Sequence, residues 1–179
     1  MPGTVDKVYE LVNERNSGDV EPVYEKTGFT READGSDIGD TYVEVDISRQ
    51  YMWFYLDGDL VLETSIVTGM PDTTKWATNV GVGSILSKTP NTNLRGANFD
   101  GSRYVTPVKY WIPIGWDGEG FHDAPWRGGF GGNIYYSNGS HGCLNMPPNL
   151  AGTLFDLVPH NAPVIVYESS TNNSPAMSY

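Results

Sequence analysis

The chain has 179 residues, 39% of them hydrophobic and 18% charged, a balance typical of one folded domain that buries a core without disulfide bonds. Its 11 basic and 22 acidic side chains give a net charge of −11, which argues against nucleic acid or an anionic membrane surface as a partner. No apolar run approaches the roughly 18 residues that span a bilayer, and the first residues lack the apolar core of a secretory signal, so we expect a soluble chain.

The amino-terminal residues 1–39 are expected to form a helix and a linker. In VDKVYELV, apolar side chains recur at helical spacing, which predicts a short helix over residues 5–12. The stretch EKTGFTREADGSDIGD is polar and contains glycine, as linkers do. Residues 1–39 are therefore interpreted as a candidate remnant of an upstream domain, and the main domain is expected to begin near Asp40.

Strand patterns follow directly after this boundary. TYVEVDIS, residues 41–48, alternates apolar and polar side chains, which predicts a half-buried strand. QYMWFYLDGDLVLETSIVTG places Asp57 and Gly58 between two β-branched and aromatic runs, which is the strongest hairpin signal in the chain. From Met70 to Gly101 the composition turns to Thr, Asn, Gly and Pro, so we expect a long functional loop, with NVGVGSIL as a strand candidate inside it.

The remaining patterns add strands and a helix. SRYVTPVKYWIPIG and APVIVYE predict strands, and apolar residues recur at helical spacing from Leu150 until Pro159. The polar tail, residues 169–179, is expected to be disordered. With 21 Gly, 12 Pro and 12% aromatic residues, the chain is predicted to form one β-rich domain over residues 40–168, a mixed sheet closing toward a barrel or sandwich with one or two short helices.

The only cysteine, Cys143, lies in the segment SHGCLN. Gly142 before it allows a sharp turn in which backbone N–H groups converge, a geometry that suits an oxyanion. A thiol becomes a nucleophile when a nearby imidazole takes its proton. Two candidate bases are present, His141 two residues away and His122 beside Asp123 in GEGFHDAPWRGGF.

Other interpretations of Cys143 stay open on the residues alone. An isolated cysteine in a soluble protein is most often a small buried hydrophobe. His122, His141 and Cys143 are acceptable zinc ligands, but no CxxC or HExxH spacing accompanies them, so we expect no metal site. Only Trp126 lies close enough in sequence to His122 to indicate a place in a cleft, whereas Trp111 is expected in the core or on a sheet face.

The order of these segments resembles a known family. His122, a spacer from Asp123 to Gly139, and then SHGCLN look like the signature of the YkuD-type L,D-transpeptidases, which build cross-links in bacterial peptidoglycan. VDISRQYMWFYLDGDLV, SIVTGMPDT, YWIPIGWDGEGFHDAPWR and SHGCLNMP occur in the order expected of that catalytic domain, so the resemblance covers residues 40–168. Residues 81–104 match the lid loop of the family only loosely, and no single residue is carried over there.

The resemblance implies a role for each residue of the motif. Cys143 is the expected nucleophile and His122 its base, with the backbone carbonyl of Asp123 as the group that orients the imidazole. His141, Gly142 and the N–H of Cys143 are expected to form the oxyanion hole and to bind the donor. The remaining motif positions are expected to support the site and bind substrate: Ser140, Asn145 and Trp126.

The resemblance also implies a reaction and its partners. Cys143 would form a thioester with the third residue of a tetrapeptide stem and release D-alanine, and a side-chain amine of a second stem would then accept the acyl group in a 3→3 cross-link. No cofactor is implied, and carbapenem β-lactams are the implied covalent inhibitors. We expect a monomer that meets peptidoglycan stem peptides outside the cytoplasm, in the cell wall or anchored to the membrane, with the signal or anchor absent from this sequence.

Three further outcomes are compatible with the same residues. Water as the acceptor would make the thioester the intermediate of an L,D-carboxypeptidase, and a free amino acid would give stem exchange. A domain whose thiol is inactive would be a wall-binding module. The products formed from a disaccharide tetrapeptide distinguish these functions.

Overall fold

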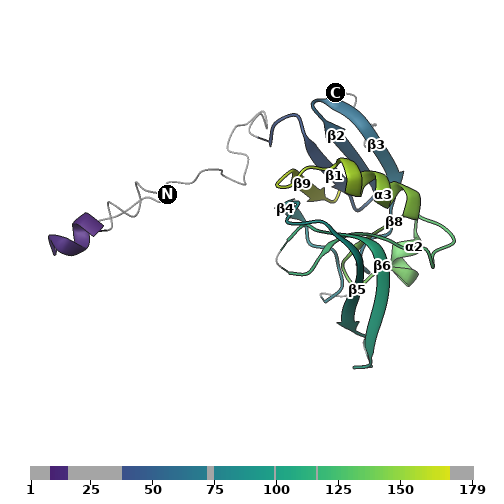
Figure 1. Ribbon diagram of the computed structural model, residues 1–179. Coiled ribbons are helices and arrows are strands. Elements are labelled where there is room, and N and C mark those ends of the chain that lie inside the picture. Colours follow the sequence, from purple (N-terminus) through teal and green to yellow (C-terminus); the bar gives the residue numbers. More distant parts are fainter. Residues whose placement is uncertain (1–8, 16–37, 72–74, 99, 116, 170–179) are drawn as a thin grey trace.

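The computed structural model describes residues 9–15, 38–71, 75–98, 100–115 and 117–169. Two mixed β-sheets and short helices make up the domain, which confirms the β-rich fold class (Figure 1). No helix in the described ranges is long and apolar enough to cross a membrane. In chain order the elements are β1 (Tyr42–Asp46), β2 (Tyr51–Leu56), β3 (Asp59–Ser65), β4 (Gly81–Ser84), β5 (Thr89–Ala97), β6 (Arg103–Pro113), β7 (Gly120–Asp123), α2 (Ile134–Asn138), β8 (Leu144–Met146), α3 (Pro148–Leu157) and β9 (Pro163–Tyr167).

The first sheet has the strand order β3-β2-β1-β9-β4. Asp57 and Gly58 both have positive φ, 52° and 87°, as a two-residue turn requires, so the predicted hairpin of β2 and β3 is confirmed. β1 was expected to be half-buried, but its residues on both faces are buried, and it is a central strand that pairs with β2 on one edge and β9 on the other. Its polar side chains are paired instead of exposed, since Glu44 accepts a hydrogen bond from the Tyr167 hydroxyl at 2.5 Å.

The second sheet has the strand order β5-β6-β7-β8 and carries the site. β4 confirms the strand candidate in NVGVGSIL, but β5 lies where a loop was predicted, so the loop prediction for residues 70–101 is wrong over residues 89–97. β5 is rich in Thr, Asn and Pro and has no buried residue. It is a strand because it pairs along its length with β6, a partner that local sequence patterns do not reveal.

The helices are short. α3 confirms the predicted helix, and the N–H of Val158 caps it on the carbonyl of Leu154 before Pro159. α2 was not predicted, because its five residues bury only Tyr135 and are too few for a periodic pattern. Residues 9–13 are helical and overlap the predicted helix 5–12, whose first residues lie outside the described ranges, as does nearly all of the tail.

Both sheets contribute to one hydrophobic core. Phe54 and Val43 from the first sheet cluster with Phe121 and Leu144 from the second, and all four side chains are fully buried. The sheets are also joined through the backbone, since the N–H of Ser84 at the end of β4 donates to a carbonyl beyond β6 at 3.1 Å. The short strands β7 and β8 continue the second sheet from β6 and contribute Phe121 and Leu144 to the core, which gives the segment around Cys143 a rigid support.

Candidate active site

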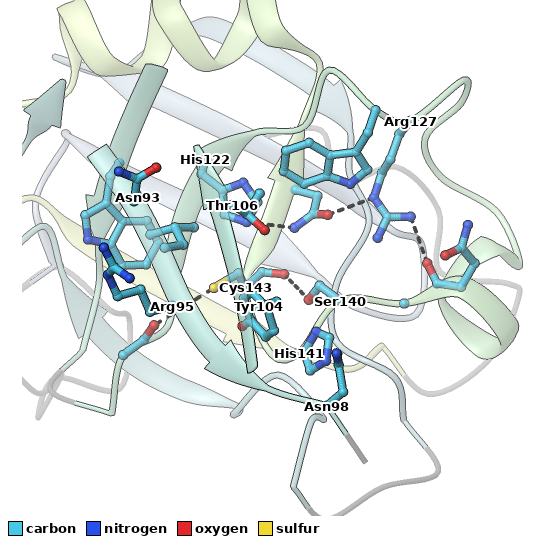
Figure 2. Close-up of a pocket in the computed structure, with 17 residues that line it drawn as sticks. Asn93, Arg95, Asn98, Tyr104, Thr106, His122, Arg127, Ser140, His141 and Cys143 are labelled. Carbon is cyan, nitrogen blue, oxygen red and sulfur yellow. Dashed lines mark hydrogen bonds between the residues drawn. The ribbon is translucent and has the colours of Figure 1, made fainter. Parts of the chain in front are cut away.

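A cavity of about 510 Å³ opens on the four-stranded sheet and reaches Cys143 (Figure 2). Strand pairing explains how distant residues meet along its wall. Trp111 in β6 pairs with His122 in β7, and His122 pairs with Asn145 in β8. Because directly paired residues point to the same face of a sheet, these three side chains form a row that lines the cavity.

The loop from Ser140 to Cys143 is held by hydrogen bonds along its length. Ser140 Oγ accepts from the N–H of Gly142 at 3.1 Å and donates to the carbonyl of Cys143 at 2.5 Å. Thr78 Oγ1 donates to the carbonyl of Gly142 at 2.7 Å. Gly142 has a φ of +113°, which L side chains rarely adopt, and a Cβ there would lie 3.0 Å from Glu119 Oε1. The turn expected at Gly142 is present, and Cys143 follows it at the start of β8.

Both ring nitrogens of His122 have hydrogen-bond partners. Nδ1 lies 2.9 Å from the backbone carbonyl oxygen of Asp123, which can only accept, so Nδ1 carries the proton. Nε2 lies 3.0 Å from Asn145 Nδ2. Burial lowers the pKa of His122, and the charge of Arg127 lowers it further, while the carbonyl and charge of Asp123 oppose this. The imidazole is therefore neutral at neutral pH, with its lone pair on Nε2.

The carboxylate of Asp123 is committed to the backbone of β6. Its Oδ1 accepts from the N–H groups of Lys109 at 2.8 Å and Tyr110 at 3.0 Å. The ladder between β6 and β7 pairs only Trp111 to Pro113, so the carboxylate satisfies amides just beyond the end of that ladder. Contact with the imidazole of His122 comes from the backbone carbonyl of Asp123, as the family resemblance implies.

Cys143 is half-buried and lines the cavity. Its Sγ lies 3.9 Å from the carbonyl oxygen of Gly118. Burial is the main reason that the pKa of the thiol is raised to about 12; the nearby carboxylates of Glu119 and Asp117 contribute in the same direction, and the N–H of Gly120 opposes them. Resting Cys143 is therefore a thiol and not a thiolate.

Of the two carboxylates, Glu119 has the larger effect on the pKa of this thiol. Its own pKa is raised to about 7 because it is partly buried. Both of its carboxylate oxygens accept from the N–H of Asn79, at 3.3 and 3.2 Å, and the side chain packs against Gly142. Above pH 7 it carries a negative charge beside the cysteine, which disfavours loss of the thiol proton.

We expect Glu119→Gln to speed alkylation of Cys143 by iodoacetamide. Glutamine keeps the contact with Gly142 but removes the charge, so the pKa of the thiol falls. Because the pKa of Glu119 is about 7, the gain should be small at pH 6 and about three- to tenfold at pH 8.5. Intact-mass kinetics measure it, with Asp59→Asn at the exposed start of β3 as a charge-matched control. Equal gains at both pH values, or in both variants, would contradict this role of Glu119.

His141 occupies a slot between two aromatic rings. Its ring centroid lies 4.1 Å from that of Trp76, edge-on, and 4.9 Å from that of Tyr104. Burial lowers its pKa, and the charge of Lys75 adds to this. In the described ranges, its buried Nε2 has no hydrogen-bond partner. The two histidines therefore differ, since the ring of His122 is held by hydrogen bonds and that of His141 by aromatic contacts.

The backbone donors near the thiol are not equivalent either. The N–H of Gly142 is already bonded to Ser140 Oγ, whereas no hydrogen bond from the N–H of Cys143 is found within the described part of the chain. An oxyanion beside Sγ would thus find the N–H of Cys143 available. Across residues 9–15 and the described parts of 38–169, no three His, Cys, Asp or Glu side chains are grouped as ligands for a metal ion.

Asp123 and Gly142, two of the eight residues expected at the site, do not line the cavity. The other six do: Ser140, His141, Cys143, His122, Asn145 and Trp126. Sequence reasoning missed four residues: Trp111, Tyr104, Arg127 and Glu119. Trp111 was expected in the core or on a sheet face, and its pairing with His122 brings it to the cavity wall. The positions of these four missed residues depend on strand pairing or on contacts between segments, for which the local sequence offers no signal.

Comparison with known families and structures agrees with this geometry. The model of the family YkuD, described as the L,D-transpeptidase catalytic domain, matches residues 40–166. Two curated relatives, both named L,D-transpeptidase 1 of Mycobacterium tuberculosis, are 36% identical over 63 residues, which is 35% of this chain and 24% of theirs. The present chain therefore matches about a quarter of the length of these relatives.

Solved structures are similar over most of the domain. A cysteine-to-serine mutant of Enterococcus faecium L,D-transpeptidase is 37% identical with a TM-score of 0.73, over 93% of this chain and 64% of that one. The ertapenem-acylated catalytic domain from E. faecium is 44% identical with a TM-score of 0.63, over 72% of this chain and 97% of that one. An L,D-transpeptidase from Mycobacterium smegmatis is 27% identical with a TM-score of 0.61, over 72% and 58% of the two chains.

Proposed function

Because the chain belongs to the YkuD family of L,D-transpeptidase catalytic domains, we propose that it cross-links peptidoglycan stem peptides with Cys143 as the nucleophile. The observation that carries this proposal is the neutral His122, oriented by the Asp123 carbonyl, on the wall of the cavity that Cys143 also lines. A thiol with a raised pKa needs a base in place when the substrate binds, and this imidazole has its lone pair on Nε2.

In the first step, the thiol proton of Cys143 passes to Nε2 of His122, which exchanges its hydrogen bond with Asn145 for one with Sγ. The sulfur attacks the carbonyl carbon of the third stem residue, and the N–H of Cys143 receives the oxyanion that forms. His141 lies in the same loop, where its backbone N–H is the second candidate donor. The C–N bond then breaks, His122 returns its proton to the leaving amine of D-alanine, and a thioester remains.

In the second step, the side-chain amine of another stem attacks the thioester carbonyl. His122 accepts a proton from this amine, and the collapse of the tetrahedral intermediate breaks the C–S bond. The sulfur regains its proton as the new amide, the 3→3 cross-link, leaves the cavity. Every proton in this cycle passes through His122, and the cycle requires no cofactor.

Carbapenems are proposed as covalent inhibitors that stop the cycle after its first step. Relatives support this, because one E. faecium structure is acylated by ertapenem and another is an avibactam carbamoyl enzyme. The sulfur of Cys143 would attack the strained amide of the β-lactam ring, and the opened inhibitor would remain bound to Cys143 as a thioester. Since the stem peptides lie in the cell wall, we place the action of the chain outside the cytoplasm, in the wall or on the membrane.

Product analysis tests the proposed function directly. The protein is incubated with a disaccharide tetrapeptide, and the products are measured by mass spectrometry. A transpeptidase gives a dimer with loss of one D-alanine, whereas a predominance of tripeptide would identify an L,D-carboxypeptidase. Intact substrate, with no adduct on Cys143 after carbapenem treatment, would overturn the proposal in favour of a wall-binding module.

A further inference from the structure

Arg127 follows β7 and joins two segments of the site. Its Nε donates to Asn145 Oδ1 at 2.7 Å, and its Nη1 donates to the backbone carbonyl of Asn138 at the end of α2, also at 2.7 Å. Figure 2 draws both hydrogen bonds beside the labelled Arg127, and a further hydrogen bond joins Asn145 to the labelled His122. The motif comparison assigns no role to this arginine.

The two ends of this hydrogen-bonded chain determine its direction. A guanidinium can only donate, so the amide of Asn145 must turn Oδ1 toward Arg127 and Nδ2 toward His122. A backbone carbonyl can only accept, so Nδ1 of His122 must donate to the carbonyl of Asp123. Both constraints require the same tautomer, with the proton on Nδ1 and the lone pair on Nε2.

We infer that Arg127 is a positioning residue, which acts through Asn145 to hold His122 in the tautomer that can accept a proton at Nε2. Asn145 is a polar relay in this role, since it transmits the donor-only character of the guanidinium to the imidazole. The effect on the rate rests on the proposed function, whereas the tautomer of His122 can be observed without any substrate.

The two charges that shift the pKa of His122 oppose each other, since Asp123 raises this pKa and Arg127 lowers it. Asp123 on its own strand is the nearest anion, and its carboxylate is committed to β6. β6 itself presents the uncharged ring of Trp111 to His122, with ring centroids 6.2 Å apart. Across the cavity Cys143 is a neutral thiol. Burial is the main cause of the lowered pKa of His122, and Arg127 is the cation that adds to it.

Nitrogen-15 NMR of the histidine rings tests this inference. The chain has three histidines, so His141 in its aromatic slot and the exposed His160 report whether each variant keeps the native fold. In the wild type we expect His122 to be neutral at neutral pH, with its proton on Nδ1. Arg127→Gln should raise the pKa of His122 and weaken the preference for the Nδ1 tautomer, which then depends on the Asp123 carbonyl alone, because the glutamine amide can donate or accept and carries no charge.

Two more variants separate positioning from packing. Arg127→Lys retains a donor-only cation and should preserve the wild-type tautomer. Asn145→Asp preserves the partner of Arg127 but offers only acceptors to His122, so Nε2 should become protonated. The pKa of His122 should then be higher in Asn145→Asp than in Arg127→Gln. Arg95→Gln, which removes another arginine from the same cavity, is the matched control and should leave the tautomer of His122 unchanged.

Acylation by a carbapenem gives the kinetic result. In Arg127→Gln the acid limb of the acylation pH profile should move to higher pH, and the acylation rate should fall about tenfold or more at pH 6 and less at pH 8.5. Arg127→Lys should recover most of this rate. A wild-type tautomer and pH profile in Arg127→Gln, or equal changes in Arg95→Gln, would overturn the inference. If the wild type is not acylated, the proposed function fails, and the NMR result still decides the role of Arg127.

Discussion

Cys143→Ala is expected to leave a folded protein that forms no cross-linked product. Removing the nucleophile abolishes both steps of acyl transfer, so turnover should fall by at least about a thousandfold. The fold should survive, because the thiol is half-buried and its hydrogen bond to the Gly118 carbonyl, at 3.9 Å, is weak. Gly142, Ser140 and Thr78 would still hold the loop in place.

The measurement combines dimer formation with intact mass after carbapenem treatment. Wild-type protein should gain the mass of one inhibitor, and Cys143→Ala should gain none. The melting temperature is the control for folding, and Ser169→Ala, two residues beyond β9, is the control substitution. Cross-linking above a few per cent of wild type, or an adduct that persists in Cys143→Ala, would show that another residue is the nucleophile.

His122→Gln is expected to slow acylation by a carbapenem about 10² to 10⁴-fold, the usual loss when a general base is removed. Glutamine cannot take the thiol proton, and Cys143 with a pKa of about 12 cannot lose it unaided at neutral pH. His141→Ala should cost less. It removes a ring that contacts Trp76 and Tyr104, but the backbone N–H remains in the loop.

Stopped-flow acylation across pH 5 to 9 compares the two variants. The pKa of His122 is lowered by burial, so the wild-type imidazole stays neutral into the acid range and the rate should fall only below that lowered pKa. This acid limb should change mainly in His122→Gln, and the exposed His160→Gln should behave as wild type. A larger loss in His141→Ala, with His122→Gln nearly normal, would make His141 the base and leave the enzyme class unchanged.

Local sequence patterns predicted the elements whose structure depends on neighbouring residues. The Asp57-Gly58 hairpin, the strand β4 and the helix α3 follow from turn residues and from side-chain periodicity, which act within a few residues. β5 escaped prediction because its conformation comes from pairing with β6. The short α2 gave no periodic signal, and the burial of both faces of β1 was not visible in its alternating pattern.

The candidate site divides in the same way. Cys143, Gly142 and the two histidines could be chosen from SHGCLN and from the resemblance, because residue type and spacing carry that information. The carbonyl of Asp123 contacts the ring of His122, as the resemblance implies, whereas the carboxylate of Asp123 binds the backbone of β6. No spacing rule distinguishes these two oxygens, since only the ladder between β6 and β7 leaves amides for the carboxylate.

The sequence by itself determined the β-rich class, the family resemblance and the chemical identity of the nucleophile candidate, because these depend on residue types in a fixed order. The tertiary structure alone decided which side chains meet. The parallel pairing of β7 with β8 sets His122 beside Asn145, and the fold then brings Arg127 to the other side of that amide. Such contacts join residues far apart in the chain, and their hydrogen-bond direction depends on partners at both ends.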